Sequence, residues 1–177
     1  MKILSLFCSV IIVTVTLASF ASAETYQHQV EVKDMTFAWK IEGDTLHGKM
    51  SAKTKGWVAV GFNPSSKMKD ANFILGYVKN GKAKVVDHFG DRSVGHSEDT
   101  KKGGTEDVTL VSGSEEKKIT TIEFTIPMNS GDKLDGVLSA DGDTVLLLAY
   151  GPDRDSFKTR HKFRDTKTVN LSTGAVK

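Results

Sequence analysis

The chain has 177 residues, with 24 lysines and arginines against 22 aspartates and glutamates, a formal charge of +2, five histidines and one cysteine. This length allows one domain with a sizeable core. A content of 38% hydrophobic and 26% charged residues excludes a disordered or fibrous chain, and the small, evenly spread charge argues against nucleic-acid binding.

The first 23 residues differ from the rest of the chain. Lys2 is the only charged residue before Glu24, residues 3–20 are largely apolar, and Ala21-Ser22-Ala23 is a small-residue cleavage signature. Together these features predict that residues 1–23 are a secretory signal peptide cleaved near Ala23. A retained N-terminal membrane anchor is the alternative, because the apolar run approaches the length that spans a bilayer.

The remaining chain, 24–177, is expected to be one exported domain, periplasmic or extracellular. Cys8 lies in the predicted signal peptide, so the mature chain has no thiol although its compartment would permit disulfides. This excludes a thiolate nucleophile, a cysteine-held iron–sulfur cluster, a blue-copper site and a covalently attached c-type haem. Any metal must be bound by histidine, methionine, carboxylate or backbone oxygen.

The mature chain reads as a succession of short strands separated by turn residues. Most of these runs alternate apolar and polar residues, whereas Gly56–Phe62 is nearly continuously apolar, as expected for a central strand covered on both faces. Asn80-Gly81 predicts a tight hairpin turn. We predict an all-β fold, a sandwich or barrel of about ten strands. The predicted strands are 26–32, 37–41, 46–52, 56–62, 73–78, 83–89, 108–111, 122–126, 145–150 and 169–171.

Three irregular stretches interrupt the strands: residues 63–71, 90–107 and 151–164. Loops of this length in compact domains are usually functional or mobile. His96 in the second stretch is predicted to be exposed or structural, with metal ligation as the alternative. The acidic residues of that stretch lack the spacing of an EF-hand loop but could bind calcium weakly; they are Glu98, Asp99, Glu106 and Asp107.

Two residues of the other stretches are candidate metal ligands. Met68 lies between two lysines without apolar neighbours, so a role as core filler is less natural there, and its thioether suits haem iron or copper(I). His161 lies in the basic run TRHKFR, which is also typical of a solvated surface strand. Its functional interpretation is an imidazole ligand, with Arg160 and Arg164 as partners for anionic groups such as haem propionates. The strand histidines His28, His47 and His88 are predicted to be structural.

The order of several motifs resembles the DOMON domain family, of the haem-binding cytochrome kind. These motifs are GWVAVGFNPSSKM at 56–68, NGKAKVVDHFG at 80–90, TIEFTIPM at 121–128, VLLLAYG at 145–151 and the histidine in TRHKFR. The resemblance covers most of residues 30–172. It implies an immunoglobulin-like antiparallel β-sandwich that binds b-type haem non-covalently, with Met68 and His161 as axial iron ligands.

The resemblance also implies a function. Methionine–histidine ligation raises the reduction potential and leaves no open position on the iron, so electron transfer is expected rather than catalysis. The redox partner would be a membrane-bound or exported reductase. Two alternatives stay open: bis-histidine ligation through His96, and a haem-free DOMON module that binds a carbohydrate or another small ligand. Apolar residues near the ligands could line the haem pocket or simply pack in the core; they are Trp57, Phe62, Phe73 and Tyr150.

Overall fold

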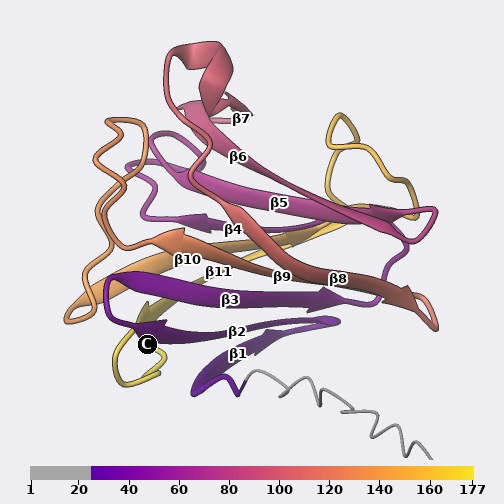
Figure 1. Ribbon diagram of the computed structural model, residues 1–177, viewed down its shortest axis with the longest axis horizontal. Helices are drawn as coiled ribbons and strands as arrows, with labels where there is room; N and C mark the ends of the chain where they lie inside the picture. The colour runs from indigo at the N-terminus through magenta and orange to yellow at the C-terminus, as the bar shows by residue number, and fades with distance from the viewer. Residues whose placement is uncertain (1–24) are drawn as a thin grey trace, which may run out of the picture.

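A computed structural model describes residues 25–177, and the predicted signal peptide lies outside the described residues. Within the described part, eleven strands form two antiparallel sheets that pack face to face, as Figure 1 shows. The predicted all-β antiparallel sandwich is therefore confirmed. Nowhere in residues 25–177 is there a helix with the length and apolarity needed to cross a membrane.

The first sheet has five strands and the second has six. The five-stranded sheet has the order β1-β2-β3-β9-β8, and the six-stranded sheet has the order β11-β10-β4-β5-β6-β7. A short 3-10 helix, η1, follows β7. The elements are β1 (His28–Val32), β2 (Met35–Glu42), β3 (Thr45–Ala52), β4 (Val58–Phe62), β5 (Asn72–Lys79), β6 (Lys82–Arg92), β7 (Gly95–Glu98), η1 (Asp99–Lys102), β8 (Thr109–Glu116), β9 (Ile119–Pro127), β10 (Asp143–Tyr150) and β11 (Phe163–Asn170).

The main core fills the space between the two sheets. In β3, β9 and β10 every second residue is buried, as the two-residue period of a strand requires when one face meets the other sheet. Phe37, Trp39 and Phe124 are completely buried there, and the ring of Phe37 stacks on those of the other two. Burial of these large apolar surfaces is the main driving force for closing the sandwich.

The six-stranded sheet is also covered on its outer face. All five residues of β4 are buried, which confirms the prediction of a central strand buried on both sides. A second apolar cluster, separate from the main core, lies on this outer face and is built from residues of β4, β5 and β6 and from the residues just before β4 and β5. Its buried members are Trp57, Ala59, Ala71, Phe73, Leu75 and Val86. The outer face is therefore not an ordinary solvated sheet surface.

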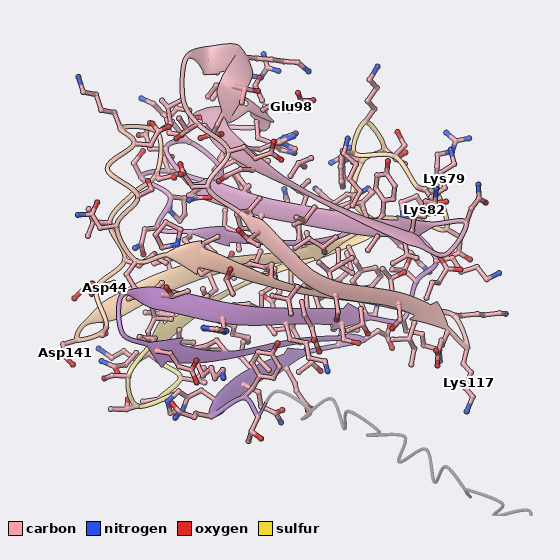
Figure 2. The ribbon with its side chains drawn as sticks, viewed as in Figure 1. Asp44, Lys79, Lys82, Glu98, Lys117 and Asp141 are labelled. Carbon is pink, nitrogen blue, oxygen red and sulfur yellow. The ribbon has the colours of Figure 1, made fainter. Side chains whose placement is uncertain are left out.

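The predicted turn at Asn80-Gly81 is confirmed. Lys79 and Lys82 pair across it, and both turn residues have positive φ, +50° and +73°, as this kind of hairpin requires. Figure 2 shows the two lysines together at one end of the molecule. Glycine is needed at the second position because it adopts this backbone conformation without steric cost.

The strands that the sequence analysis shortened or missed are edge strands. β7 lies inside the stretch predicted as a loop, β8 continues to Glu116 rather than ending at residue 111, and β11 begins at Phe163 rather than 169. β7, β8 and β11 flank their sheets and carry many polar, partly exposed residues. Since neither face of such a strand is fully buried, its sequence lacks the apolar alternation on which the prediction relied.

Candidate functional site

A cavity of about 890 Å³ lies over the outer face of the six-stranded sheet. Its floor is the outer apolar cluster, including Trp57, Ala59, Phe73 and Leu75. Its walls come from three segments: the loop after β4, the β6–β7 connection, and the segment 151–162 after β10, which rises at the upper right of Figure 1. These correspond to the three irregular stretches of the sequence, so the segments predicted to be functional meet around one cavity.

Met68 lies in the first wall and is held there by the backbone. Its amide donates to the Ser93 carbonyl at 3.3 Å, and the Asp70 amide donates to the Gly90 carbonyl at 2.7 Å. The Gly90 amide in turn donates to the Ala71 carbonyl at 2.9 Å. A side chain on Gly90 would collide with the backbone carbonyl of Met68, so this glycine permits the close approach of the loop to β6. The Met68 loop is thus fixed to the strand beside it.

His161 lies in the segment after β10, between two points of attachment. The Trp57 indole Nε1 donates to the Thr159 carbonyl at 3.0 Å, and the Lys162 amide donates to the Tyr150 carbonyl at 2.8 Å. His161, between them, lines the same cavity as Met68. Both residues also line an adjoining hollow of about 370 Å³. The two candidate ligands, far apart in the sequence, are therefore brought to one cavity.

The surroundings of His161 favour its neutral form. Partial burial lowers the pKa of the His161 imidazole, and the nearby charges of Arg164 and Arg160 lower it further. A neutral imidazole has the free nitrogen lone pair that a metal ligand needs. Both arginines are exposed and line the cavity, where their guanidinium groups can pair with an anionic group on a bound molecule.

The cavity also contains a pair of histidines, His88 and His96, that the sequence alone does not place there. The Nδ1 atoms of His88 and His96 lie 2.6 Å apart, and the His96 ring also packs against Phe73 at 5.4 Å between centroids. Burial, followed by the charge of His96, lowers the pKa of His88 to about 4, and burial likewise lowers the pKa of His96. His88 is only 7% exposed, and its Nε2 is buried without a partner. Alternation along the strand predicted in 83–89 could have placed His88 on the face of Val86, but no sequence signal pairs it with His96.

Two of the four predicted pocket aromatics lie elsewhere. Trp57 and Phe73 line the cavity, whereas Phe62 and Tyr150 belong to the core between the sheets and are absent from the cavity wall. The expectation for Phe62 and Tyr150 is therefore corrected: their positions in β4 and β10 point them to the inner face, because neighbouring residues of a strand face opposite sides. Ala59 and Ala149, which precede Phe62 and Tyr150 by an odd number of residues, line the cavity instead.

The chemistry of this cavity suits a large planar cofactor with a soft metal. A thioether and a neutral imidazole are donors that suit iron in haem, the floor is apolar, and cationic side chains stand at its edge. Its volume is in the range of sites for cofactor-sized molecules. Val94, 74% exposed, is an apolar side chain on the wall of the same opening. The residues present therefore fit a haem group.

Comparisons with known proteins identify the family of the chain. The family model described as the DOMON domain matches residues 31–151. The chain is 26% identical over 161 residues to human DBH-like monooxygenase protein 1, covering 87% of this chain and 25% of that protein. It is 27% identical over 133 residues to human putative DBH-like monooxygenase protein 2, covering 74% of this chain and 25% of that protein. The chain thus spans about a quarter of the length of these curated relatives.

Two solved structures share the fold. The cytochrome b domain of pyranose dehydrogenase from Coprinopsis cinerea aligns with a TM-score of 0.61 and 13% identity, over 79% of this chain and 78% of that one. The cytochrome domain of Myriococcum thermophilum cellobiose dehydrogenase aligns with a TM-score of 0.58 and 13% identity, over 81% and 77%. At this identity the likeness establishes the fold alone.

Proposed function

Because the chain belongs to the DOMON domain family, we propose that it binds b-type haem non-covalently and transfers electrons, with Met68 and His161 as the axial iron ligands. The observation that carries this proposal is that Met68 and His161, from separate loops, line one cavity with an apolar floor. The cytochrome domains that share the fold support the same cofactor class.

The chain's residues have distinct tasks in this proposal. Haem, when bound, supplies a metal that accepts and releases one electron. Met68 and His161 would both bind the iron, which would leave no open position on it for oxygen. Arg160 and Arg164 would pair with the propionates at the edge of the cavity, while Trp57 and Phe73 would exclude water from the macrocycle.

A separate electron donor or acceptor follows from a carrier function, and we propose a membrane-bound or exported reductase as this partner. The cytochrome domains with the same fold are named as parts of dehydrogenases, which are redox enzymes. The DBH-like relatives are named as monooxygenases, but this chain spans about a quarter of their length. We propose a carrier role for this domain because Met68 and His161, if both bind the iron, would leave no position open on it for oxygen or a substrate.

We also propose that the protein is exported after cleavage near Ala23, as its N-terminal sequence predicts. Edman sequencing or mass spectrometry of the protein from the cell exterior or periplasm should give Glu24 as the first residue. Recovery of the uncleaved chain in the membrane fraction would support the retained anchor instead.

The test of haem binding is an optical titration of the purified protein with haemin. The wild-type protein should bind one equivalent and give the sharp Soret and visible bands of a low-spin, six-coordinate iron. Met68→Leu and His161→Ala should each abolish the low-spin spectrum. Matched controls are Met128→Leu and His47→Ala, whose side chains are not among the cavity residues.

The same titration separates the alternatives. Loss of the low-spin spectrum in His96→Ala, with a normal spectrum in Met68→Leu, would contradict the proposed ligands and support bis-histidine ligation. Absence of any haem binding by the wild type would contradict the proposal itself. A thermal shift with soluble glycans would then favour the haem-free binding module, for which the aromatic side chains of Trp57, Tyr77 and Phe157 that line the cavity are the candidate contacts.

A further inference from the structure

A cluster of three carboxylates lies beside the haem cavity but outside it. Asp87 is in β6, Asp99 begins η1, and Asp135 lies in the segment between β9 and β10. One carboxylate oxygen from each residue lies within 4.8 Å of the other two. Two oxygens bound to one calcium ion, each at about 2.4 Å, are at most about 4.8 Å apart. The cluster therefore has the dimensions of a site in which three oxygens share one ion.

Several oxygens of this cluster have no hydrogen-bond partner. Asp87 and Asp99 are 3% and 1% exposed. Both carboxylate oxygens of Asp99 and Oδ1 of Asp87 are buried without a partner. Buried polar atoms are almost always paired, and an unpaired buried carboxylate is especially costly. Buried carboxylate oxygens that lie close together without hydrogen-bond partners indicate that a positively charged ligand binds between them.

The remaining contacts hold the third carboxylate in place. Asp135 accepts hydrogen bonds from Ser130 Oγ and from Asn72 Nδ2, each at 2.8 Å. The Asn72 amide Oδ1 is itself buried without a partner. An amide oxygen is a common calcium ligand, so the residue that bonds to Asp135 carries a further unpaired oxygen of a suitable type.

The electrostatics agree with the geometry. Burial first, and then the neighbouring aspartates, raise the pKa of Asp87 to about 8 and that of Asp99 to about 7. Burial is also the main cause that raises the pKa of Asp135 to about 6. Carboxyl groups hold their protons in this way when burial and mutual repulsion penalise their charged form and no positive charge offsets these two effects. A bound divalent ion would offset it.

We propose that Asp87, Asp99 and Asp135 form a divalent-cation site, distinct from the haem cavity, and that its ion is calcium. The oxygen-only donor set excludes the soft metals that bind thiolate or imidazole. Calcium fits better than magnesium because it accepts irregular coordination and loses its water more readily in a buried site.

The ion would join β6 and η1 to the distant segment between β9 and β10. Figure 1 shows the β7–η1 segment above β6 and the orange segment between β9 and β10 on the same side of the molecule. Asp99 follows directly after β7, which carries His96 and Glu98 into the cavity wall. The calcium ion would therefore fasten the segment that forms one wall of the haem cavity.

The test uses the full chain, without haem, after dialysis against a chelator. Thermal unfolding is followed by circular dichroism with added calcium chloride or magnesium chloride, and stoichiometry is measured by isothermal titration calorimetry. We expect one calcium per chain and a rise of the unfolding temperature by about 5 °C or more at saturating calcium. Magnesium should produce a smaller rise.

The decisive variants remove one charge each. Asp99→Asn and Asp87→Asn should lose the calcium response, yet in chelator they should unfold at or above the wild-type temperature, because repulsion in the cluster is relieved. This expectation distinguishes a lost site from a misfolded protein. Glu106→Gln is the matched control: Glu106 is an exposed acid between η1 and β8, and its removal should leave the calcium response intact.

Three results would overturn the proposal. The first is a wild-type protein that shows neither binding heat nor a shift with calcium. The second is an Asp99→Asn variant that responds to calcium as the wild type does. An equal response to magnesium would overturn the assignment to calcium. None of these measurements involves haem. Failure of the calcium proposal would therefore not contradict haem binding, and failure of haem binding would not contradict the calcium site.

Discussion

Asp87 and His88 are neighbours in β6, and their side chains lie on opposite faces of the six-stranded sheet. His88 lies in the outer cavity, beside His96 and the ring of Phe157. Asp87 lies on the other side with the carboxylates of the acidic cluster. The outer site offers sulfur, imidazole and aromatic surface, whereas the acidic cluster offers only oxygen. One strand thus separates an environment suited to a haem from one suited to a hard cation.

The same contrast holds along the whole sheet, whose inner face is packed and whose outer face encloses a cavity. Phe37 belongs to the five-stranded sheet and packs against that inner face. It is completely buried and contacts Phe62 as well as the neighbouring aromatic rings. Phe73 is on the outer face, with one side turned to the cavity. The two phenylalanines are therefore chemically equal residues in unequal surroundings, which makes them a direct comparison of the faces.

The largest effect is expected from Phe37→Ala. Deleting this ring should lower the free energy of unfolding by about 3–5 kcal/mol, because a completely enclosed side chain leaves a void. Phe73→Ala should cost less than about 2 kcal/mol, since the ring already borders a cavity and loses fewer contacts. Urea denaturation of the haem-free protein measures both values.

Haem titration of the two variants completes this comparison. Phe73→Ala should bind haem more weakly than the wild type does, but its bound form should show the same low-spin spectrum. Phe37→Ala should bind haem normally under conditions in which the variant is folded. If Phe73→Ala proved as destabilising as Phe37→Ala, the outer cluster would be a second core rather than the floor of a binding site.

An intermediate effect is expected at Gly90, the residue that lets the Met68 loop approach β6. Gly90→Ala places a methyl group against the Met68 carbonyl, so the loop must move. Overpacking of this kind costs about 1–3 kcal/mol, and displacement of Met68 should convert the haem spectrum from low-spin to high-spin.

Gly136→Ala is the matched control for this prediction. Nothing lies within 4 Å of the position that its new methyl group would occupy, so stability should change by less than about 0.5 kcal/mol. A low-spin spectrum in Gly90→Ala would mean that Met68 is not held by this contact or is not a ligand.

The fold was largely predictable from the sequence because its central strands are buried on at least one face. The continuous apolar runs of β4 and β10 and the turn at Asn80-Gly81 follow from local patterns. The start of β11 and the extent of β8 were not predictable. Their pairing depends on the neighbouring strand rather than on burial of their own side chains.

The candidate site was predictable only in part. Met68 and His161 each stand out from their local sequence, and the structure brings both to one cavity. The His88–His96 pair and the acidic cluster are products of tertiary structure, since each joins residues from separate segments. Asp99 was noticed as part of an acidic stretch, but its partners Asp87 and Asp135 could not be inferred from spacing.

Titration of the two β6 neighbours should make the stability of the protein depend on pH in opposite directions. The pKa of Asp87 is raised to about 8 by burial and by Asp135, Asp99 and Asp107. Its contribution to stability is therefore fully present below its ordinary pKa of 3.8 and is lost as the pH rises through about 8. Without calcium, this predicts that the protein weakens towards alkaline pH.

His88 should produce the opposite limb of the pH profile. Burial and the charge of His96 lower its pKa to about 4, and the nearby charges of Lys101 and Lys84 act in the same direction against that of Glu98. Because the unfolded chain binds the proton more readily, the contribution of His88 is present above its ordinary pKa of 6.5 and is lost as the pH falls through about 4. Acid should therefore destabilise the outer face.

The measurement is the free energy of unfolding in urea with chelator, between about pH 4.5 and pH 8.5. Each limb should amount to at least about 1 kcal/mol, since one pKa unit corresponds to about 1.4 kcal/mol. Asp87→Asn should flatten only the alkaline limb, and His88→Gln only the acid limb, because the side chains face different environments. If either variant changed both limbs equally, the two faces would titrate as one coupled system, and the separation of a haem face from a cation face by this strand would be wrong. Saturating calcium should itself abolish the alkaline limb in the wild type, since the ion holds the carboxylates in their charged form.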